Sequence, residues 1–563
     1  MERNVPQSSL PWTGERMVPG KSDVATELFH WQRYLYFRPW YDDAKVVDAA
    51  SGEGYGTGFI STYATSAIGI DLCGDAVAHG NTRYSDAKFD VHDVTTFDYS
   101  NADLVVSFET IEHVPDPVGL LKAYGACSGR IVISTPNRKT HSPGNSLTDK
   151  PLNSFHTVEW TPNEFAELIR ENFPDRQVRF LSQEGRWPGL ITEGLDDDAM
   201  YCIAVIGDGE LPKWPSIGLA IPTVDNVAQA QETLVHFSRF YPGQIRFAVV
   251  CNGSSEATIS KLKEHAQTVP YMLEIIESKE NLGYGRGANI GLDWLRNNTD
   301  CELFGVSNDD VVPGPSTLPE LVSAFSFLQD SGVNPGMIGP MSNEINGLQK
   351  VETLPITDLE SLLYSVEAYH KQNHGQVVEH LQIRGLFFLM TKECLDTVGG
   401  FDPRFNYGNF EDDDLNLRCK LAGYTLWLSQ GSLLFHHGSQ TFAQLLEGST
   451  IRYSASLERN KEIFKWKWDL MDPDQWPMVS ELPDGVNLQV PLDATYPIEY
   501  PVNMEGQTFD LYSQLSDIEF VKWVYDRLQV RDRSARREVV KALVATQLTS
   551  AVAEVQEQKQ IAV

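Results

Sequence analysis

The sequence predicts an α/β protein with two doubly wound domains and a C-terminal helical extension. Its 563 residues exceed what one hydrophobic core ordinarily holds. Short β-branched runs alternate with helix-like apolar periods in two separate series. A polar, turn-rich stretch at 208–215 separates the two series and reads as a linker. We therefore expect one domain at 1–207, a second at 216–470 and an extension at 471–563.

The composition narrows the class of protein. Hydrophobic residues make up 42% and charged residues 22%, which is typical of a soluble globular chain. There is no apolar run long enough to span a membrane and no apolar core of a signal peptide near Met1, so we expect no transmembrane segment. The seven cysteines lack metal-type spacing, which favours reduced thiols and a cytoplasmic location. The net charge of 45 − 77 = −32 argues against a nucleic-acid partner.

The first domain opens with a strand, a glycine-rich turn and a helix. The predicted strand Lys45–Ala50 leads into the turn Ser51–Gly58, and a helix is expected from Phe59. This layout lets backbone amides approach a nucleotide-like ligand, although a purely structural turn is also open. The next strand ends at Asp71, where a pair of ribose hydroxyls would be held.

Several ordered motifs in this domain resemble class I S-adenosylmethionine-dependent methyltransferases, and some are similar to the small-molecule and sugar methyltransferases among them. The motifs are Thr13–Gly20, Val47–Gly56, Gly69–Asp71, Phe108–Asp116, Ser134–Asn137 and Asn153–Glu159. The resemblance implies a Rossmann-like fold and S-adenosyl-L-methionine as cofactor. The cofactor-binding residues it implies are Asp48, Gly52 and Gly54 for the methionine part, Asp71 for the ribose, Asp93 for the adenine amine, and Glu109. Ala50 departs from the family, which usually has glycine there.

Methyl transfer requires an aligned nucleophile and a base that takes the hydroxyl proton. His113 and His156 are the catalytic candidates, with a capping or packing role left open for His113. Glu109, Glu112 and His113 together could also hold a divalent ion, because carboxylates and imidazole suit one.

A second series of strands and helices follows the linker. Strands are predicted at 216–223, 246–253, 274–279 and 302–310, with a helix at 228–240. The last strand delivers Asn308, Asp309 and Asp310 to its tip. Oxygen ligands there suit Mg²⁺ or Mn²⁺ bound to a diphosphate, and a simple turn is the alternative.

Four consecutive carboxylates, Glu411 to Asp414, form the most unusual stretch of this domain. Leu417 and Leu421 follow at helical spacing, so a helix is predicted to begin here. The helix macrodipole favours Asp413 and Asp414 as capping residues in the first turn. Glu411 and Asp412 would then lie at the junction of loop and helix and face a pocket.

The order of motifs in this domain resembles glycosyltransferase family 2 of the GT-A fold. They are Pro222-Thr223, Asn252-Gly253, Asn281–Asn289, Asn308–Asp310, Gly385, Gly399–Asp402, Phe410–Asp414, His436 and Phe464–Trp468. The resemblance implies inverting transfer, with Asp412 as general base beside Glu411, and with Asp310 and His436 as metal ligands. The nucleotide-sugar pocket it implies comprises Pro222, Thr223, Asn252, Gly283, Asn289, Asn308, Asp309, Arg384 and Gly385. Asn308 departs from the usual first aspartate of the metal motif.

Together the two resemblances imply a bifunctional enzyme of polysaccharide biosynthesis. Its partners would be a nucleotide-diphosphate sugar donor and a glycan or lipid-linked saccharide acceptor, with a sugar hydroxyl methylated after transfer. Two alternatives remain open. One domain could be a binding or scaffold module, or the methyltransferase could act on a separate small molecule or nucleotide-linked sugar.

The extension contains a proline-rich strap at 472–504 and a helical pattern at 511–557. Its helices could form a homo-oligomer, close the acceptor site or pack on the second domain, and the sequence favours none of these. The basic cluster Arg531–Arg537 could contact a membrane surface peripherally, although a solvated face is the favoured interpretation.

Overall fold

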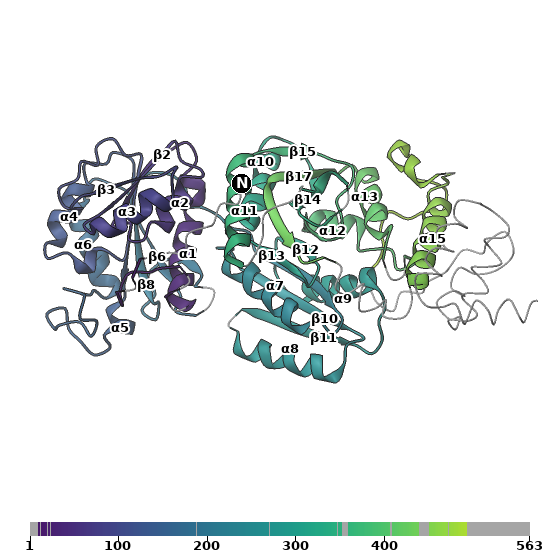
Figure 1. The fold of residues 1–563 in the computed structure, drawn as a ribbon, viewed down its shortest axis with the longest axis horizontal. Coiled ribbons are helices and arrows are strands. Elements are labelled where there is room, and N and C mark those ends of the chain that lie inside the picture. The colour runs from purple at the N-terminus through teal and green to yellow at the C-terminus, as the bar shows by residue number, and fades with distance from the viewer. Residues whose placement is uncertain are drawn as a thin grey trace, which may run out of the picture.

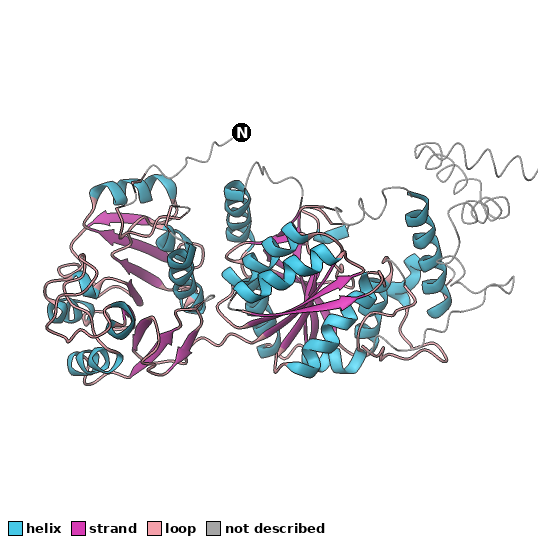
Figure 2. Ribbon diagram, turned by 90° about the horizontal axis from the view of Figure 1, so that it is seen from below, coloured by secondary structure: helices cyan, strands magenta, loops and turns pink. Residues whose placement is uncertain are grey.

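The computed structural model describes residues 10–492 apart from 12, 20, 23, 187–188, 270, 346, 352–358, 406–407, 439–449 and 471. Two α/β units lie side by side, each with helices packed around a central sheet (Figures 1 and 2). The helical pattern at 511–557, its predicted oligomer and the cluster Arg531–Arg537 lie outside the described residues, as does the strap beyond Leu492. Among the described helices, none has the length and apolar character that crossing a membrane requires.

The first sheet has the strand order β3-β2-β1-β4-β5-β8-β6-β7. β3, β2, β1, β4 and β5 are parallel, while β8 runs antiparallel to both β5 and β6. The strands are β1 (Lys45–Ala49), β2 (Ser66–Asp71), β3 (Lys88–Val91), β4 (Leu104–Phe108), β5 (Arg130–Pro136), β6 (Val178–Gln183), β7 (Ile191–Glu193) and β8 (Tyr201–Ile206). Two apolar clusters pack on this sheet, so the doubly wound prediction is confirmed with an added antiparallel edge.

The helices of this unit connect its strands and cover the sheet (Figure 1). They are α1 (Val24–Tyr36), η1 (Arg38–Trp40), α2 (Tyr55–Ile60), α3 (Gly74–Arg83), η2 (Ile111–His113), α4 (Pro117–Tyr124), α5 (Arg138–His141) and α6 (Pro162–Asn172). α2 begins four residues earlier than predicted, because Gly54, at φ +100°, occupies the N-cap position and reverses the chain there.

The second sheet has the order β11-β10-β9-β12-β16-β14-β17-β13, and β15 pairs with β17. β11, β10, β9 and β12 are parallel, and β16 is antiparallel to β12. The strands are β9 (Ile217–Thr223), β10 (Ile245–Asn252), β11 (Met272–Ser278), β12 (Leu303–Ser307), β13 (Val311–Pro313), β14 (Pro335–Ser342), β15 (Val377–Glu379), β16 (Phe387–Thr391) and β17 (Thr425–His436). The four predicted strands of this unit all form.

Helices flank this sheet as well, and two apolar clusters fill the space beneath them. They are α7 (Val227–Arg239), α8 (Glu256–Thr268), α9 (Tyr284–Asn298), α10 (Thr317–Asp330), η3 (Gly347–Gln349), α11 (Leu359–Asn373), α12 (Lys392–Val398), α13 (Glu411–Leu421), α15 (Thr450–Lys467) and η4 (Pro473–Met478). α15 packs through Phe464 and Trp468 against the turn and helix around Phe405 and Leu417.

Polar contacts join the two units. The Gln32 amide donates to the backbone carbonyls of Arg239 and Tyr241, both at 3.1 Å. The buried Arg38 guanidinium lies 3.1 Å from the buried Glu320 carboxylate, so a charge from each unit is neutralised by the other.

Candidate active sites

The glycine turn after β1 is held by the acid at the end of β2. The Gly52 amide donates to Oδ2 of Asp71 at 3.0 Å, and the Cys73 amide donates to Oδ1 at 2.8 Å. Gly52 and Ala50 both have positive φ, +59° and +63°. Asp71 therefore lies at the expected strand end and also fixes the turn. Ala50 adopts a conformation that glycine would reach without strain.

Asp48 lies beneath this turn and is almost fully buried. Its carboxylate accepts hydrogen bonds from the hydroxyls of Tyr34 and Thr57, at 3.1 and 2.7 Å. Burial raises the pKa of Asp48 to about 6. Both oxygens of Asp48 therefore already accept hydrogen bonds from protein hydroxyls, and the side chain supports the turn.

Two exposed apolar side chains lie at the ends of β2 and β3. Leu72, directly after β2, is 70% exposed, and Val91, at the end of β3, is 57% exposed. Asp93 follows, and its carboxylate accepts from the Thr95 amide and hydroxyl, which lowers its pKa. The sequence analysis predicted a role for Asp93 but none for Leu72 and Val91. Leu72 could have been noticed, because an apolar residue directly follows Asp71.

The acids after β4 have separate surroundings. Glu109, at φ +52°, accepts from the Ser134 hydroxyl at 2.6 Å and lies 3.6 Å from Arg33. Glu112 is fully buried, and burial together with the Glu109 charge raises its pKa well above the usual range. Glu109 contacts Ser134 and Arg33, away from His113, so the Glu109–Glu112–His113 group does not assemble as a cation site.

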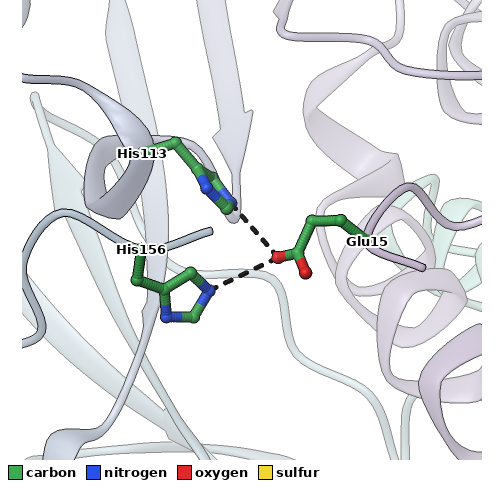
Figure 3. Close-up of side chains that lie close together, drawn as sticks. All are labelled: Glu15, His113 and His156. Atoms are coloured by element: carbon green, nitrogen blue, oxygen red, sulfur yellow. Dashed lines mark ion pairs between the residues drawn. The ribbon is translucent and has the colours of Figure 1, made fainter. Parts of the chain in front are cut away.

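A different carboxylate completes this group. Oε1 of Glu15 lies 3.5 Å from Nε2 of His113 and 3.4 Å from Nε2 of His156, and both rings point toward it (Figure 3). Both ring nitrogens of His156 already have hydrogen-bond partners, because Nδ1 lies 2.6 Å from the Glu159 carboxylate and Nε2 lies 2.8 Å from the Asn153 amide, which leaves His113 as the stronger candidate base. Sequence reasoning placed Glu15 in a motif without giving it a role.

In the second unit, Asp310, which directly precedes β13, faces His436, the last residue of β17. Oδ1 of Asp310 lies 3.1 Å from Nε2 of His436, and both atoms are buried. Nδ1 of His436 lies 2.7 Å from the Glu344 carbonyl, so it carries a proton and leaves Nε2 facing Asp310. Among the described residues, neither facing atom makes a hydrogen bond elsewhere.

Asp412 lies next to the Arg384–Gly385 turn. The Gly385 amide lies 3.3 Å from Oδ2 of Asp412, and the Arg384 guanidinium lies 3.7 Å from the same oxygen. The Tyr284 hydroxyl donates to the Gly385 carbonyl. Burial is the main cause that raises the pKa of Tyr284, and the charges of Glu411, Asp412, Asp309 and Asp310 add to it. The two acidic segments therefore approach the same phenol.

The other carboxylates of this run do not cap the helix as predicted. α13 begins at Glu411, so all four acids lie in its first turn, and Phe410 occupies the N-cap position at φ +68°. Asp414 is fully buried and lies 2.8 Å from Arg418 and 2.5 Å from Lys467. Asp413 accepts from Gln382. Tertiary partners therefore replace the predicted capping bonds.

Glu411 is buried, and burial followed by repulsion from Asp412 raises its pKa well above the usual range. Burial and the neighbouring acid therefore favour the protonated form of Glu411 and disfavour a second charge on this pair.

Several residues that were predicted to line the nucleotide-sugar pocket instead form hydrogen bonds with neighbouring protein segments. Asn252, at the end of β10, bridges to Asn281 and to the carbonyl of Gly283. Asn289 exchanges hydrogen bonds with the backbone of Phe401 on both of its amide atoms. These side chains are buried with protein partners and support the site rather than face a ligand.

The strand ends beside them are also joined. Thr223, which follows Pro222 at the end of β9, donates to Asp309 at 2.6 Å. Burial raises the pKa of Asp309 to about 7. Asn308 is half-buried. Its backbone amide donates to the Leu386 carbonyl at 2.9 Å, which links the segment after β12 to the turn that contains Gly385.

Comparison with known proteins agrees with this division. Residues 26–173 match a methyltransferase domain family, and residues 215–450 match the family described as glycosyltransferase like family 2. A protein of Mycobacterium tuberculosis named as a probable S-adenosylmethionine-dependent methyltransferase is 34% identical over 231 residues, which cover 38% of this chain and 81% of that protein. The chain belongs to the S-adenosylmethionine-dependent methyltransferases.

A protein of Mycolicibacterium smegmatis, also named as a probable S-adenosylmethionine-dependent methyltransferase, is 36% identical over 175 residues, which cover 30% of this chain and 66% of that protein. Among solved structures, a bacterial methyltransferase domain named CtHen1-C is 18% identical, with a TM-score of 0.26, over 32% of this chain and all of that one. The chain thus carries a methyltransferase half and a glycosyltransferase-like half.

Proposed function

We propose that the chain is a bifunctional enzyme of glycan biosynthesis. The glycosyltransferase half would move a sugar, with inversion, from a nucleotide-diphosphate donor to a glycan or lipid-linked saccharide acceptor. The methyltransferase half would methylate a sugar hydroxyl with S-adenosylmethionine. The observation that carries the proposal is that the two acidic segments meet at one turn: the backbone amide of Asn308 donates to the Leu386 carbonyl at 2.9 Å, and the Gly385 amide lies 3.3 Å from Oδ2 of Asp412.

Sugar transfer would divide the work between these segments. Asp412 would accept the proton of the acceptor hydroxyl, because it is the more exposed member of the Glu411–Asp412 pair. The Gly385 amide and Arg384 hold the Asp412 carboxylate in place. The buried pair Asp310 and His436 fits Mg²⁺ or Mn²⁺, because its facing atoms have no other hydrogen bonds among the described residues. Such an ion would neutralise charge on the diphosphate leaving group.

Methyl transfer would use the pocket at the ends of β1, β2 and β4. The turn at Gly52 and the Asp71 carboxylate would hold the methionine and ribose parts, and Leu72 and Val91 would cover the adenine. His113 would take the proton of the sugar hydroxyl, because alignment with a sulfonium supplies most of the rate and a nearby base supplies the rest.

Two measurements test the proposal. Thermal unfolding of the full chain with a panel of nucleotide sugars and Mn²⁺ should show stabilisation by one donor class, because a ligand of the native state raises the melting temperature. Mass spectrometry of a saccharide acceptor incubated with that donor, with and without S-adenosylmethionine, should then show a glycosylated product that gains a methyl group only with the cofactor. A panel without any stabilising donor, or methylation of the donor before transfer, would contradict the proposed order.

A further inference from the structure

Two histidines and a carboxylate converge in the methyltransferase half, and both histidines are held in the same tautomer. Nδ1 of His113 lies 3.0 Å from the Phe155 carbonyl, and Nδ1 of His156 lies 2.6 Å from the Glu159 carboxylate. Both partners only accept hydrogen bonds, so each Nδ1 carries a proton and each Nε2 is left to face Glu15. A histidine whose second nitrogen is anchored in this way is the usual arrangement in metal sites.

Asn153 supports this assignment. Its Nδ2 lies 2.8 Å from Nε2 of His156 and 3.2 and 3.3 Å from the two oxygens of Glu15. Its Oδ1 accepts from the Phe155 amide, which fixes the orientation of the side-chain amide. Nδ2 is therefore a donor, and the atoms that it contacts are acceptors.

The distances suit a metal ion. One ligand atom each from Glu15, His113 and His156 lie within 4.8 Å of one another. The separations of 3.4 and 3.5 Å from Oε1 of Glu15 match the spacing of about 3.0 to 3.5 Å between ligands bound at about 2.1 Å.

Glu112 adds an independent observation. Glu112 is fully buried, and its Oε1 atom makes no hydrogen bond among the described residues. This oxygen lies 3.9 Å from Nε2 of His113 and so points toward the same group of atoms. A buried carboxylate oxygen without a donor is costly unless a positive charge faces it.

Another group of histidines and a carboxylate, found among the described residues, already has a positive charge facing its carboxylate. Glu320, His370 and His374 also lie close together, at the contact between the two halves. There the Arg38 guanidinium already lies 3.1 Å from Glu320 and supplies the positive charge. No arginine or lysine is in ion-pair contact with the Glu15 group among the described residues.

We propose that Glu15, His113 and His156 bind a divalent transition-metal ion, with Oε1 of Glu112 as a further oxygen ligand. The mixture of imidazole and carboxylate favours Mn²⁺ or Zn²⁺ over Mg²⁺. The ion would also pin residues 13–18 over the cofactor pocket, because the Arg16 side chain lies next to Gly52 and interacts with Cys73.

The metal site itself does not depend on the proposed methylation, and only its role in catalysis rests on that proposed function. As ligands the two histidines would not take the hydroxyl proton. The ion would instead lower the pKa of a sugar hydroxyl bound to it, the proton would pass to water, and the oxygen would accept the methyl group as the S–CH3 bond of the cofactor breaks.

The test measures metal binding without cofactor or acceptor, so it stands apart from the proposed function. The full chain is prepared as Asp310→Asn/His436→Ala, which removes the candidate ligands of the glycosyltransferase half, and is titrated with Mn²⁺ by electron paramagnetic resonance and with Zn²⁺ by calorimetry. We expect one bound ion, and a loss of affinity of about 10-fold or more on adding Glu15→Gln or His113→Ala. The matched control Glu167→Gln, an exposed glutamate on α6, should leave the affinity unchanged.

Limited trypsin digestion follows the N-terminal segment in the same proteins. Cleavage after Arg16 and Lys21 should slow when Mn²⁺ is added to the parent and to Glu167→Gln, and should not slow in Glu15→Gln. Absence of a bound ion in the parent, or an affinity unchanged by both Glu15→Gln and His113→Ala in chains that melt like the parent, would overturn the proposal.

Discussion

The Asp310–His436 pair and the Glu15–His113–His156 group are made from the same chemical parts, but the chain positions them by different means. In the glycosyltransferase half, Val311 pairs with His436 across β13 and β17, and the His437 amide donates to the Asp310 carbonyl. The backbone ladder thus places the carboxylate beside the imidazole. In the methyltransferase half, the three residues come from an N-terminal segment, a single helical turn and a loop, and side chains hold them.

The difference has a physical consequence. A pair set by strand register moves only if the sheet moves, whereas a group set by side chains can open when one contact is lost. We therefore expect mutations around Asp310 to change the chemistry of a rigid site, and mutations around Glu15 to change whether the site closes at all.

The largest effect should come from Asp412→Asn. Loss of the proposed base should lower sugar transfer by about 10³-fold, within the range of general-base contributions, and leave donor binding in place. Methyl transfer by the same chain should be unchanged, which would separate the two halves. Steady-state assays of both reactions check this, with Asp330→Asn, an exposed acid on α10, as the control. Sugar transfer within tenfold of wild type would remove Asp412 from its role.

Asp414→Asn should have the largest effect on stability. The substitution leaves the buried Arg418 without its carboxylate and removes one of the two carboxylates of Lys467, which keeps Asp402; breaking such a buried ion pair costs about 3 to 5 kcal/mol. Asp413→Asn is the matched control, because burial and the neighbouring Asp412 already raise the pKa of Asp413 to about 7. Denaturant unfolding followed by tryptophan fluorescence measures both, since Trp468 donates to Asp414. Equal losses in the two variants would contradict the assigned roles.

The contact between the halves should depend on pH in two directions. Although burial lowers the pKa of His374, hydrogen bonds to Asp42 and Glu320 outweigh it and raise the pKa to about 9, with the Arg38 charge opposing. Burial raises the pKa of Glu320, but His374, His370 and Arg38 outweigh it and lower the pKa to about 2.

The stability from His374 is therefore complete below its unfolded pKa of about 6.5 and is lost as the pH rises through 9. The stability from Glu320 is present above an unfolded pKa of about 4.3 and is lost as the pH falls toward 2. We expect a loss of about 1 to 2 kcal/mol between pH 7 and pH 10, after allowance for solvent screening. Unfolding free energies across this range should slope less in Glu320→Gln, and an unchanged slope would argue against the contact.

The smallest effect should come from Ala50→Gly. Ala50 is held at φ +63°, and relief of that strain should stabilise the methyltransferase half by about 0.5 kcal/mol. The opposite change, Gly54→Ala, should destabilise it, because an added Cβ would lie 2.8 Å from the Phe89 ring. Thermal unfolding of both variants measures the difference, and a lower melting temperature for Ala50→Gly would show that the turn is not strained.

Sequence patterns were sufficient where strand ends set the position of a side chain. Asp71 and Asp310 were placed at the ends of strands predicted from the sequence, so their positions at the sheet edge could be predicted in advance, whereas His436 was named only through the family resemblance. The approach of Asp412 to the Gly385 turn could be expected only from the family resemblance, because no local rule joins a helix start to a turn 27 residues earlier.

The rest depends on tertiary contacts that sequence spacing does not encode. Asp413 and Asp414 lie at positions that suit helix capping. Their carboxylates instead contact Gln382 and Lys467, which the fold brings within reach. Glu15 meets His113 and His156 through contacts across more than 90 positions of the chain, which no periodicity reports. Asn289 was predicted to bind the nucleotide sugar, but its side-chain amide donates to the Phe401 backbone carbonyl.

The measurement that tests the account most directly is a double titration of the full chain by calorimetry. S-adenosylhomocysteine is titrated first, and UDP, GDP and dTDP are titrated with Mn²⁺ in separate experiments. We predict that Asp71→Ala loses the cofactor product but keeps the nucleotide, and that Asp310→Asn loses the nucleotide but keeps the cofactor product. Loss of both ligands in either folded variant, or failure of the wild-type chain to bind one of the two classes, would contradict two separate transferase sites on one chain.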